Sequence, residues 1–215
     1  MKKTQTGFTL IELAIVLVII GLLLGGVLKG QELIGIAKVK NIVADFQNTQ
    51  IYLYGYQAKF KALPGDDALV ANHITGGTQA TTPGVVGDFR IDGGWNSVTT
   101  TDESYLFWQH VRLAGLAPGS TATDSPAYIP RNADGGVIGI QSLNAFATIT
   151  GMTGSFVVCS GNILGRLAKQ VDVTMDDGET NTGSVRALTV GAAAANGTAA
   201  AAVQDGALYN VCMSF

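Results

Sequence analysis

The sharpest change of polarity along the chain lies at its amino terminus. Residues 1–7 are polar and basic, and residues 8–30 are dominated by apolar side chains. At about 1.5 Å per residue, the run Phe8–Leu28 predicts a helix of roughly 30 Å, which is enough to cross the hydrocarbon core of a bilayer. Two lysines precede this helix, so the positive-inside tendency predicts a cytoplasmic amino terminus and an exported remainder.

A single carboxylate, that of Glu12, interrupts the apolar segment. An acidic side chain inside such a helix costs about 2.5–3.5 kcal/mol on insertion scales, so a partner charge is expected. A signal peptide or a plain membrane anchor would also begin with basic residues and an apolar run. No small-residue cleavage site follows the run, however, and neither alternative explains a glutamate so close behind Gly7-Phe8.

Four glycines lie toward the end of this segment, at positions 21, 25, 26 and 30. Small residues at such spacing predict close packing of one helix against another. Each glycine also weakens a helix by about 1 kcal/mol relative to alanine, so the same stretch would permit local melting.

Residues 31–62 have a different pattern, in which apolar side chains at near-helical spacing alternate with charged and amide side chains. This predicts an amphipathic continuation of the first helix that packs on a sheet and ends where Pro64-Gly65 favours a turn. The predicted apolar stripe consists of Ile36, Val39, Val43, Phe46 and Leu53. A group of aromatic side chains is predicted to join the helix end to the rest of the domain: Tyr52, Tyr54, Tyr56 and Phe60.

Residues 63–215 are predicted to form a globular head, so that the chain as a whole belongs to the α+β class. A second helix is predicted at Glu103–Leu116, with Leu106, Trp108, Val111, Leu113 and Leu116 as core positions. A short helix is predicted at Asn162–Gln170, and residues 192–206 are predicted to be a low-complexity loop. Short apolar or alternating runs predict strands of an antiparallel sheet at residues 136–141, 146–150, 154–161 and 208–212.

The charge of the head argues against a nucleic-acid partner. Residues 62–215 contain six basic and thirteen acidic residues, a net charge of −7. Binding to phosphates requires clustered Lys and Arg, so direct nucleic-acid binding is not expected. Charged residues make up only 13% of the chain and glycine is abundant, which suits an exported, assembling protein with many loops better than a cytosolic enzyme.

The two cysteines, Cys159 and Cys212, both lie in the predicted exported part. An oxidising compartment favours a disulfide between them that closes the carboxy-terminal region, and two buried free thiols are the alternative.

Motifs of known enzyme classes are absent from the sequence, including the P-loop, G-x-S-x-G, H-E-x-x-H and C-x-x-C. His73 and His110 are isolated, and a histidine on a partly apolar helix is more often packed or surface-exposed than catalytic. The sequence therefore predicts no enzymatic activity and no resident cofactor, apart from a calcium ion at one acidic cluster.

Asp172, Asp176, Asp177 and Glu179 form that acidic cluster, together with Asn181. Oxygen ligands on glycine-containing loops are what Ca²⁺ requires, although the spacing is not that of an EF-hand. Asx-turns, in which short acidic side chains accept backbone N–H bonds, are the alternative. A second group, Asp66 and Asp67 with Asp88 and Asp92, is a weaker calcium candidate.

The sequence Gly7-Phe8-Thr9-Leu10-Ile11-Glu12 resembles the GFTLIE signature of type IV pilins and type II secretion pseudopilins. The resemblance implies a pilin-like fold, cleavage of the leader 1–7 after Gly7 by a prepilin peptidase, and methylation of the new amino group of Phe8. It also implies that Glu12 meets the amino-terminal charge of a neighbouring subunit in a homo-oligomeric filament. A platform protein and ATPases would drive assembly from the inner membrane into a periplasmic or extracellular filament.

Further implications of the resemblance concern the head and the role in the filament. Disulfides near the carboxyl terminus are common in pilins, and some pseudopilins bind calcium in their heads. Lys29 replaces the proline of many pilins, and the ALPGD and ESYLFWQHVRLAGL stretches resemble a pseudopilin-like subgroup; both favour a pseudopilin or minor pilin. The glycine-rich loops suit an exposed major pilin equally well, and a membrane-tethered binding domain or enzyme is the alternative from another class.

Overall fold

The structure, a computed structural model, describes residues 9–143, 149–190 and 198–215. The chain divides into two compact units, Met1–Ala37 and Lys38–Phe215, and helix α1 (Leu10–Phe60) contributes to both. In the first unit, the described residues belong almost entirely to α1, which is long and apolar enough there to cross a membrane.

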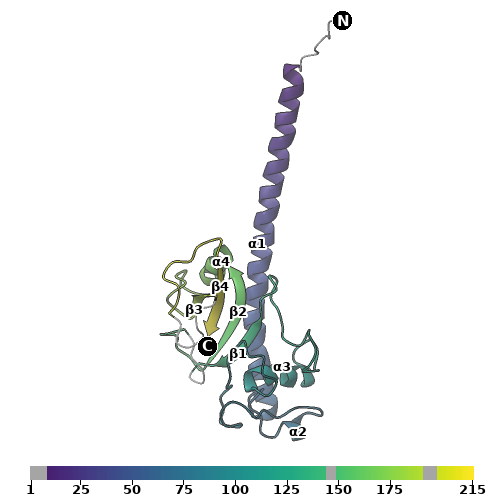
Figure 1. Ribbon diagram of the computed structural model, residues 1–215, viewed down its shortest axis with the longest axis vertical. Helices are drawn as coiled ribbons and strands as arrows, with labels where there is room; N and C mark the ends of the chain where they lie inside the picture. The colour runs from purple at the N-terminus through teal and green to yellow at the C-terminus, as the bar shows by residue number, and fades with distance from the viewer. Residues whose placement is uncertain (1–8, 144–148, 191–197) are drawn as a thin grey trace. The chain divides into compact units, whose positions relative to one another are not determined.

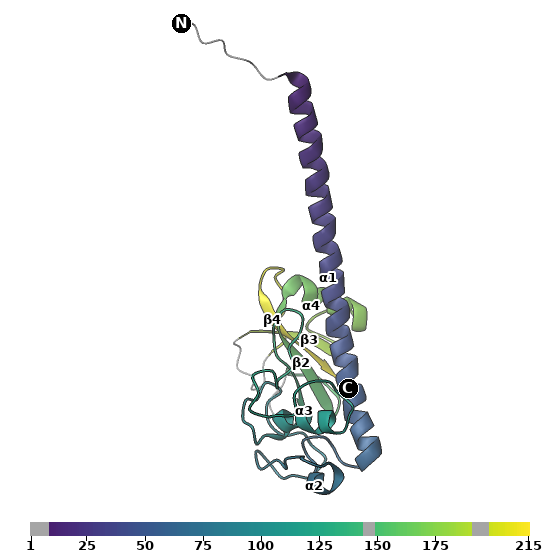
Figure 2. The same cartoon turned by 90° about the vertical axis from the view of Figure 1, so that its right-hand side faces the viewer.

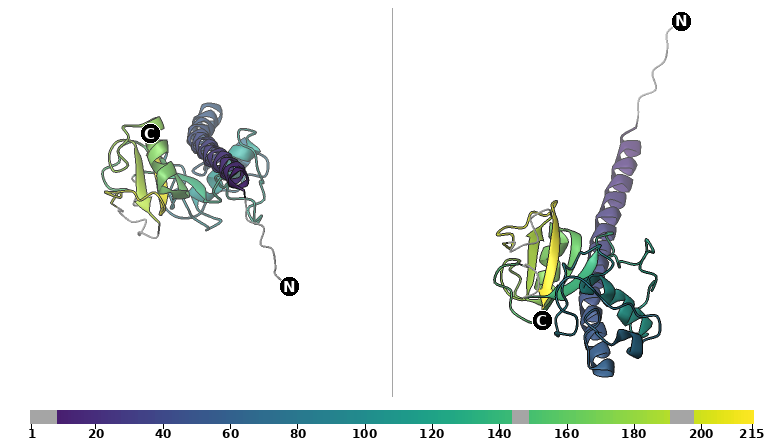
Figure 3. Two further views of the ribbon diagram at one scale, coloured as in Figure 1. Left: turned by 90° about the horizontal axis from the view of Figure 1, so that it is seen from above. Right: turned by 60° about the horizontal axis from the view of Figure 1, so that its bottom comes forward.

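The second unit contains the later part of α1 and the remaining helices and strands of the described chain (Figure 1). Figures 1, 2 and 3 agree that this part of α1 runs alongside the sheet and that α2 and α3 lie near its Phe60 end. The elements after α1 are α2 (Val70–His73), α3 (Glu103–Leu113), β1 (Ile138–Ser142), β2 (Phe156–Leu164), α4 (Gly165–Met175), β3 (Val185–Thr189) and β4 (Leu208–Ser214).

Helix α1 ends because the backbone turns left-handed directly after Phe60. Lys61 has φ of 58°, and its N–H still donates a hydrogen bond of 2.9 Å to the carbonyl of Gln57. A left-handed residue after the last helical position satisfies carbonyls that would otherwise lack donors. Pro64, three residues further on, cannot extend the helix.

The four strands form one antiparallel sheet in the order β1-β2-β4-β3. Side chains alternate between its two faces, as the two-residue period of a strand requires. Val158 of β2 and Met213 of β4 pair on the face that α1 covers, whereas Cys159 and Cys212 pair on the opposite face. The predicted α+β architecture, a long amino-terminal helix followed by an antiparallel sheet, is confirmed.

The main core lies between the sheet and α1, with α4 packed into the same cluster. Val39, Phe46 and Leu53 of the predicted stripe are buried there, and Val43 is partly buried. Ile36 is 41% exposed, and the fully buried Ile42 belongs to the stripe instead, which the sequence analysis missed. Helical geometry explains this, because positions 39, 42, 46, 49, 53 and 56 follow one another at the three- and four-residue spacing of a single face.

Helix α3 begins at Glu103 as predicted and is buried along nearly its whole length, polar side chains included. Of the predicted core positions, Leu106, Trp108 and Val111 are buried, while Leu113 and Leu116 are partly buried. Gly115 follows the helix with φ of 77°.

The predicted helix Asn162–Gln170 is wrong at both ends. Strand β2 continues to Leu164, and α4 occupies Gly165–Met175. Asn162 has φ of 57° at an irregularity in the β2–β4 pairing, after which Ile163 and Leu164 pair with β4 again. This bulge lets the strand pass through a sequence that locally favours a helix.

Of the other predicted strands, 136–141, 154–161 and 208–212 correspond to β1, β2 and β4, whereas β3 is not predicted by the sequence analysis. Residues 146–148 of the predicted strand 146–150 lie outside the described residues, as do residues 192–197 of the predicted loop 192–206. The described part of that loop, residues 198–206, contains no helix or strand.

Candidate functional site

The first part of α1 presents an exposed apolar surface, in which Glu12 is the one charged side chain before Lys29. Its large apolar side chains are between 47% and 86% exposed within the single chain. Soluble proteins rarely expose contiguous apolar patches of this extent, which mark contacts with lipid or with other protein chains. These side chains are Leu10, Ile11, Leu13, Ile15, Val16, Leu17, Val18, Ile19, Ile20, Leu22, Leu23, Leu24, Val27 and Leu28.

Glu12 caps the beginning of α1 together with Thr9. The backbone N–H and the hydroxyl of Thr9 each donate to Glu12 Oε2 at 2.8 Å, and the Glu12 N–H lies 3.3 Å from Thr9 Oγ1. This is the reciprocal capping box that threonine and a glutamate three positions later form at helix starts. Both hydrogen bonds use the same carboxylate oxygen, so Oε1 accepts none from the described residues and can meet another donor.

Gly7 and Phe8, the predicted cleavage and methylation positions, lie outside the described residues. The glycines at positions 21, 25, 26 and 30 lie within α1, and a β-carbon added at any of them would meet nothing within 4 Å. No contact with the described residues therefore requires glycine there. An approach by another helix remains a physical reason for these small residues.

The two cysteines form a disulfide between neighbouring strands. Cys159 and Cys212 lie directly opposite each other in the pairing of β2 and β4 and are buried. They pack in a second, smaller apolar cluster on the face of the sheet opposite α1. The disulfide therefore links the two inner strands of the sheet.

The predicted acidic cluster lies at the junction of α4 and the loop before β3. Carboxylate oxygens of Asp172, Asp176 and Asp177 all lie within 4.8 Å of one another. Burial raises the pKa of Asp172 to about 6, and the nearby charges of Asp177, Asp176 and Glu179 raise it further. The structure thus brings together three of the four predicted ligands, whereas Glu179 is exposed and is not part of this close group.

The acids of the weaker calcium candidate, Asp66, Asp67, Asp88 and Asp92, do not gather as the sequence predicts. The carboxylate of Asp67 interacts with a different set of side chains: it accepts a hydrogen bond from the Tyr56 hydroxyl and contacts the His73 ring nitrogen. Asp66 and Asp92 instead lie near Glu103, a buried acid of α3 that the sequence analysis did not include. Burial raises the pKa of Glu103 to about 8, and the charges of Asp66, Asp92 and Asp88 act in the same direction.

Both histidines have hydrogen-bond partners within the described chain. Gly65 N–H donates to His110 Nδ1 at 2.9 Å, so the other ring nitrogen of neutral His110 donates to the Thr78 carbonyl at 2.8 Å. Burial lowers the pKa of His110, which favours this neutral form. His73 Nδ1 lies 2.6 Å from Asp67 Oδ2, and the imidazole ring stacks on the ring of Phe60.

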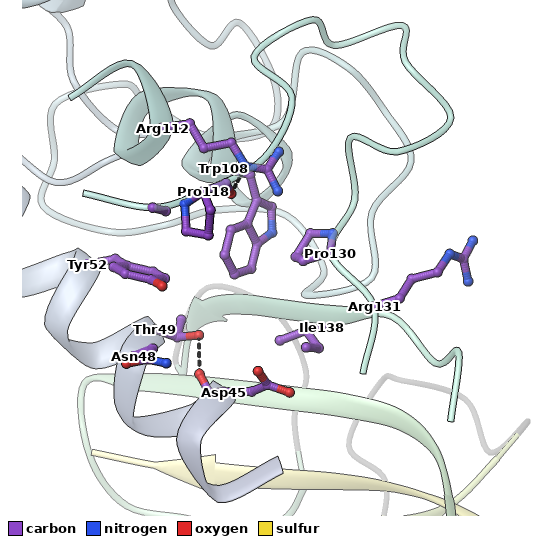
Figure 4. A pocket seen from close by; sticks show the side chains of 11 residues that line it. Asp45, Asn48, Thr49, Tyr52, Trp108, Arg112, Pro118, Pro130, Arg131 and Ile138 are labelled. Atoms are coloured by element: carbon purple, nitrogen blue, oxygen red, sulfur yellow. Dashed lines mark hydrogen bonds between the residues drawn. The ribbon is translucent and has the colours of Figure 1, made fainter. Parts of the chain in front are cut away.

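A small cavity of about 130 Å³ lies between α1, α3 and β1 (Figure 4). Trp108 and Tyr52 line it, and Asp45 supplies a carboxylate whose pKa burial raises to about 6. The guanidinium of Arg112 is already bound to the carbonyls of Pro118, Ser120 and Tyr128. The described lining contains neither cysteine, serine nor histidine, and the hydroxyl of Thr49 donates to the backbone carbonyl of Asp45 at 2.7 Å.

Residues 2–28 match the prokaryotic N-terminal methylation motif. This motif is the signature of type IV pilins and pseudopilins, so the resemblance noted in the sequence is confirmed over that segment. No curated protein and no solved structure matches the chain significantly. The match ends within the apolar part of α1 and leaves the rest of the chain to be interpreted from its own structure.

Proposed function

We propose that this chain is a structural subunit of a type IV pilus or pilus-like filament, processed after Gly7 and polymerised through its amino-terminal helix. The observation that carries the proposal is the exposed apolar surface of Leu10–Leu28 within a matched methylation motif. In the precursor, this surface is covered by lipid. After extraction from the membrane, the helices of other copies would have to cover it.

Glu12 supplies the specificity of this assembly. Inside a bundle of apolar helices, its carboxylate would be unstable without a counter-charge. Cleavage after Gly7 would create a positively charged amino group at Phe8, and the corresponding group of a neighbouring subunit would approach the free Oε1. The capping hydrogen bonds from Thr9 hold the carboxylate in place for this contact.

A filament subunit of this kind has a defined cellular location and defined partners. The precursor would be a single-pass protein of the inner membrane with its amino terminus in the cytoplasm, where a prepilin peptidase acts on it. A platform protein and its ATPase would then move it into a periplasmic or extracellular filament. The head would serve as the outer surface of that filament, without a catalytic role.

Mass spectrometry and amino-terminal sequencing test the processing step. Protein recovered from membranes and from sheared surface material should begin at Phe8 and be about 14 Da heavier than the unmodified chain, because one methyl group replaces hydrogen. A mature protein that retains residues 1–7 would contradict the proposal and favour a membrane-tethered domain.

The same fractions separate a pilus subunit from its nearest alternative. Processed protein in the sheared fraction supports an extracellular pilus. Processed protein confined to membranes supports a pseudopilin or minor pilin. Lys29 favours this alternative because it replaces the helix-kinking proline of many pilins.

A matched pair of substitutions tests the role of Glu12. We expect Glu12→Gln to be processed but nearly absent from filaments, since the amide lacks the charge that pairs with the neighbouring amine. Glu32→Gln is the control, because Glu32 is an exposed acid of the same helix that pairs with Lys29 at 2.7 Å. Equal filament yields from both variants would contradict the assembly role of Glu12.

A further inference from the structure

Asp45 carries a carboxylate that the described chain leaves without a partner. Its side chain is half-buried and lines the cavity between α1, α3 and β1. It accepts no hydrogen bond from the described residues and forms no ion pair with them. Burial raises the pKa of Asp45 to about 6, and no nearby cation acts in the opposite direction. A carboxylate withdrawn from water in this way is stabilised when a positively charged donor pairs with it.

Neither cation in the lining of the cavity supplies that charge. The guanidinium of Arg112 donates to three backbone carbonyls. Arg131 donates to a carbonyl of its own loop, and Figure 4 shows its side chain extending away from the cavity. The hydroxyl of Thr49 is also engaged, since it donates to the backbone carbonyl of Asp45 and not to its carboxylate.

The walls of the cavity are largely aromatic and apolar. Tyr52 follows Asp45 by two turns of α1, while Trp108 comes from α3 and Ile138 from β1. Figure 4 shows the indole ring of Trp108 and the carboxylate of Asp45 on opposite sides of the cavity. Aromatic faces attract cations and pack against methylene groups, so these walls complement the carboxylate in recognising an organic cation.

Two further polar groups at the cavity lack partners within the described chain. Trp108 is only 5% exposed, yet its indole N–H donates no hydrogen bond to the described residues. The hydroxyl of Tyr52 likewise makes none with them. Buried polar groups normally find a partner in the protein, in water or in a ligand. Unpaired polar groups on both α1 and α3 therefore indicate a space that holds a polar occupant.

The size and charge of the cavity limit what that occupant can be. A volume of about 130 Å³ admits a ligand the size of roughly four or five water molecules. A calcium ion requires about six to eight oxygen ligands, whereas Asp45 is the one carboxylate in the described lining. An anion would be repelled by that carboxylate. A short alkyl chain that ends in an ammonium group fits both the volume and the charge.

We propose that this cavity binds the ammonium group of a short aliphatic amine, with Asp45 as its counter-charge and the rings of Tyr52 and Trp108 against its methylene groups. Free amines and the lysine side chain share this chemistry. All three residues belong to the unit Lys38–Phe215, and the inference does not rest on the proposed filament function.

Thermal unfolding of the full-length protein in nonionic detergent tests the site with n-butylammonium chloride. A ligand this small is expected to bind with a Kd in the millimolar range. At about ten times the Kd, the Tm should rise by about 3–6 °C over a reference with KCl at equal ionic strength. 1-Butanol at the same concentration should not raise the Tm, because it lacks the charge. An equal response to 1-butanol, or no response to the amine, would overturn the proposal.

The fluorescence of Trp108 gives a local readout of the same binding. The chain has two tryptophans, so Trp95→Phe leaves Trp108 as the sole reporter. Titration of this variant with n-butylammonium should change the emission in a saturable manner, with the Kd obtained from the Tm. A change that grows linearly with concentration would show nonspecific interaction and contradict the proposal.

A matched pair of variants tests the role of the carboxylate. Asp45→Asn should melt no lower than the parent without amine, because it removes an unpaired charge, and should bind n-butylammonium at least tenfold more weakly. Glu32→Gln removes an exposed acid of the same helix outside the cavity and should bind as the parent does. Parental affinity in Asp45→Asn would overturn the proposal.

The amide of Nα-acetyl-lysine distinguishes the two sources of the ammonium group. Binding of this compound with an affinity similar to that of n-butylammonium would show that the cavity admits a lysine side chain. Binding of n-butylammonium alone would restrict the ligand to a free amine. Binding of neither compound would contradict the proposal for both sources.

Discussion

The hydroxyl of Tyr56 donates a hydrogen bond of 2.7 Å to Asp67 Oδ2 across the turn that follows α1. Both side chains are almost completely buried. His73 Nδ1 lies 2.6 Å from the same oxygen, and Leu69 N–H donates to Asp67 Oδ1. Burial alone would raise the pKa of Asp67, but the hydrogen bonds from His73 and Tyr56 outweigh it and hold the pKa below its usual value. The contacts fix the path of the chain as it leaves the helix.

Tyr56→Phe should destabilise the head by about 1–3 kcal/mol, because the buried carboxylate of Asp67 loses a hydrogen-bond donor. Urea unfolding of the detergent-solubilised full-length protein measures this change. Tyr54→Phe is the matched control: Tyr54 is 49% exposed, and its hydroxyl has no hydrogen bond within the described chain. Equal stabilities of the two variants would show that the Tyr56–Asp67 bond contributes nothing.

Glu103 predicts a specific dependence of stability on pH. Its pKa rises from an ordinary value of 4.5 to about 8 in the folded protein, so the folded state retains a proton that the unfolded state releases. The stabilising contribution is therefore present below about pH 4.5 and is lost as the pH rises to about 8.

Between pH 5 and pH 8, the free energy of unfolding of Glu103→Gln should fall by roughly 1–3 kcal/mol less than that of the parent. This is the scale of one unsatisfied buried group. Urea unfolding at several pH values, with EDTA present throughout, measures the difference from the parent. Asp45 and Asp172, whose pKa values burial raises to about 6, titrate in both proteins and do not act on Glu103, so their contributions cancel in this comparison. Parallel profiles for parent and variant would show that Glu103 does not cause the dependence.

Loss of the disulfide should destabilise the head strongly. Cys159 and Cys212 are separated by 53 positions, and a crosslink that closes a loop of this size contributes about 4 kcal/mol on the chain-entropy account. The double variant Cys159→Ser/Cys212→Ser should unfold at a lower urea concentration and with a larger m-value, since its unfolded state is more expanded. A variant as stable as the oxidised parent would exclude a stabilising role for the crosslink.

Gly139→Ala should disturb the edge strand β1. A β-carbon at this position would lie 1.8 Å from the carbonyl oxygen of Trp95, so either the strand or the loop must move, at a cost of about 1–3 kcal/mol. Gly206→Ala is the control, because a β-carbon there would meet nothing within 4 Å. Thermal unfolding compares the two, and a Gly139→Ala variant as stable as the control would contradict the close approach.

The long helix could be predicted from sequence because both of its determinants are local. Uniform apolarity before Leu28 and near-helical spacing after it each specify a helix without reference to distant residues, and Val39, Phe46 and Leu53 were correctly identified as core. Ile36 was misassigned because periodicity alone does not show where along the helix the head begins. The position along α1 at which the head begins is determined by tertiary packing and not by the local sequence pattern.

The bulge in β2 and the position of α4 could not be predicted in the same way. Residues 162–170 have helical character, but pairing of Ile163 and Leu164 with β4, more than forty positions away, keeps the strand extended. Tertiary contacts overrode local preference there. Once α4 is assigned correctly, the four-residue spacing of Asp172 and Asp176 places both on one side of the helix end, which is the signal for their proximity.

For the candidate sites too, local sequence patterns could be recognised, whereas contacts made only by the fold could not. The residues of the methylation motif were found because they are contiguous, whereas Glu103 was missed as a neighbour of Asp66 and Asp92 because only the fold brings α3 to that loop. The burial of Asp172 was also unforeseen, since an acid in an acidic stretch of sequence is ordinarily exposed.

The order of the strands has a consequence for biosynthesis. Strand β4 is the last of the four to be made, yet it lies inside the sheet and is the strand partner of both β2 and β3. Until it emerges from the ribosome, β3 lacks the one strand partner that the described residues give it, and the core beneath α1 stays open on one side. The apolar part of α1 is synthesised long before that moment, so a nascent chain inserted in a bilayer through this helix would carry an unfinished sheet until β4 is made.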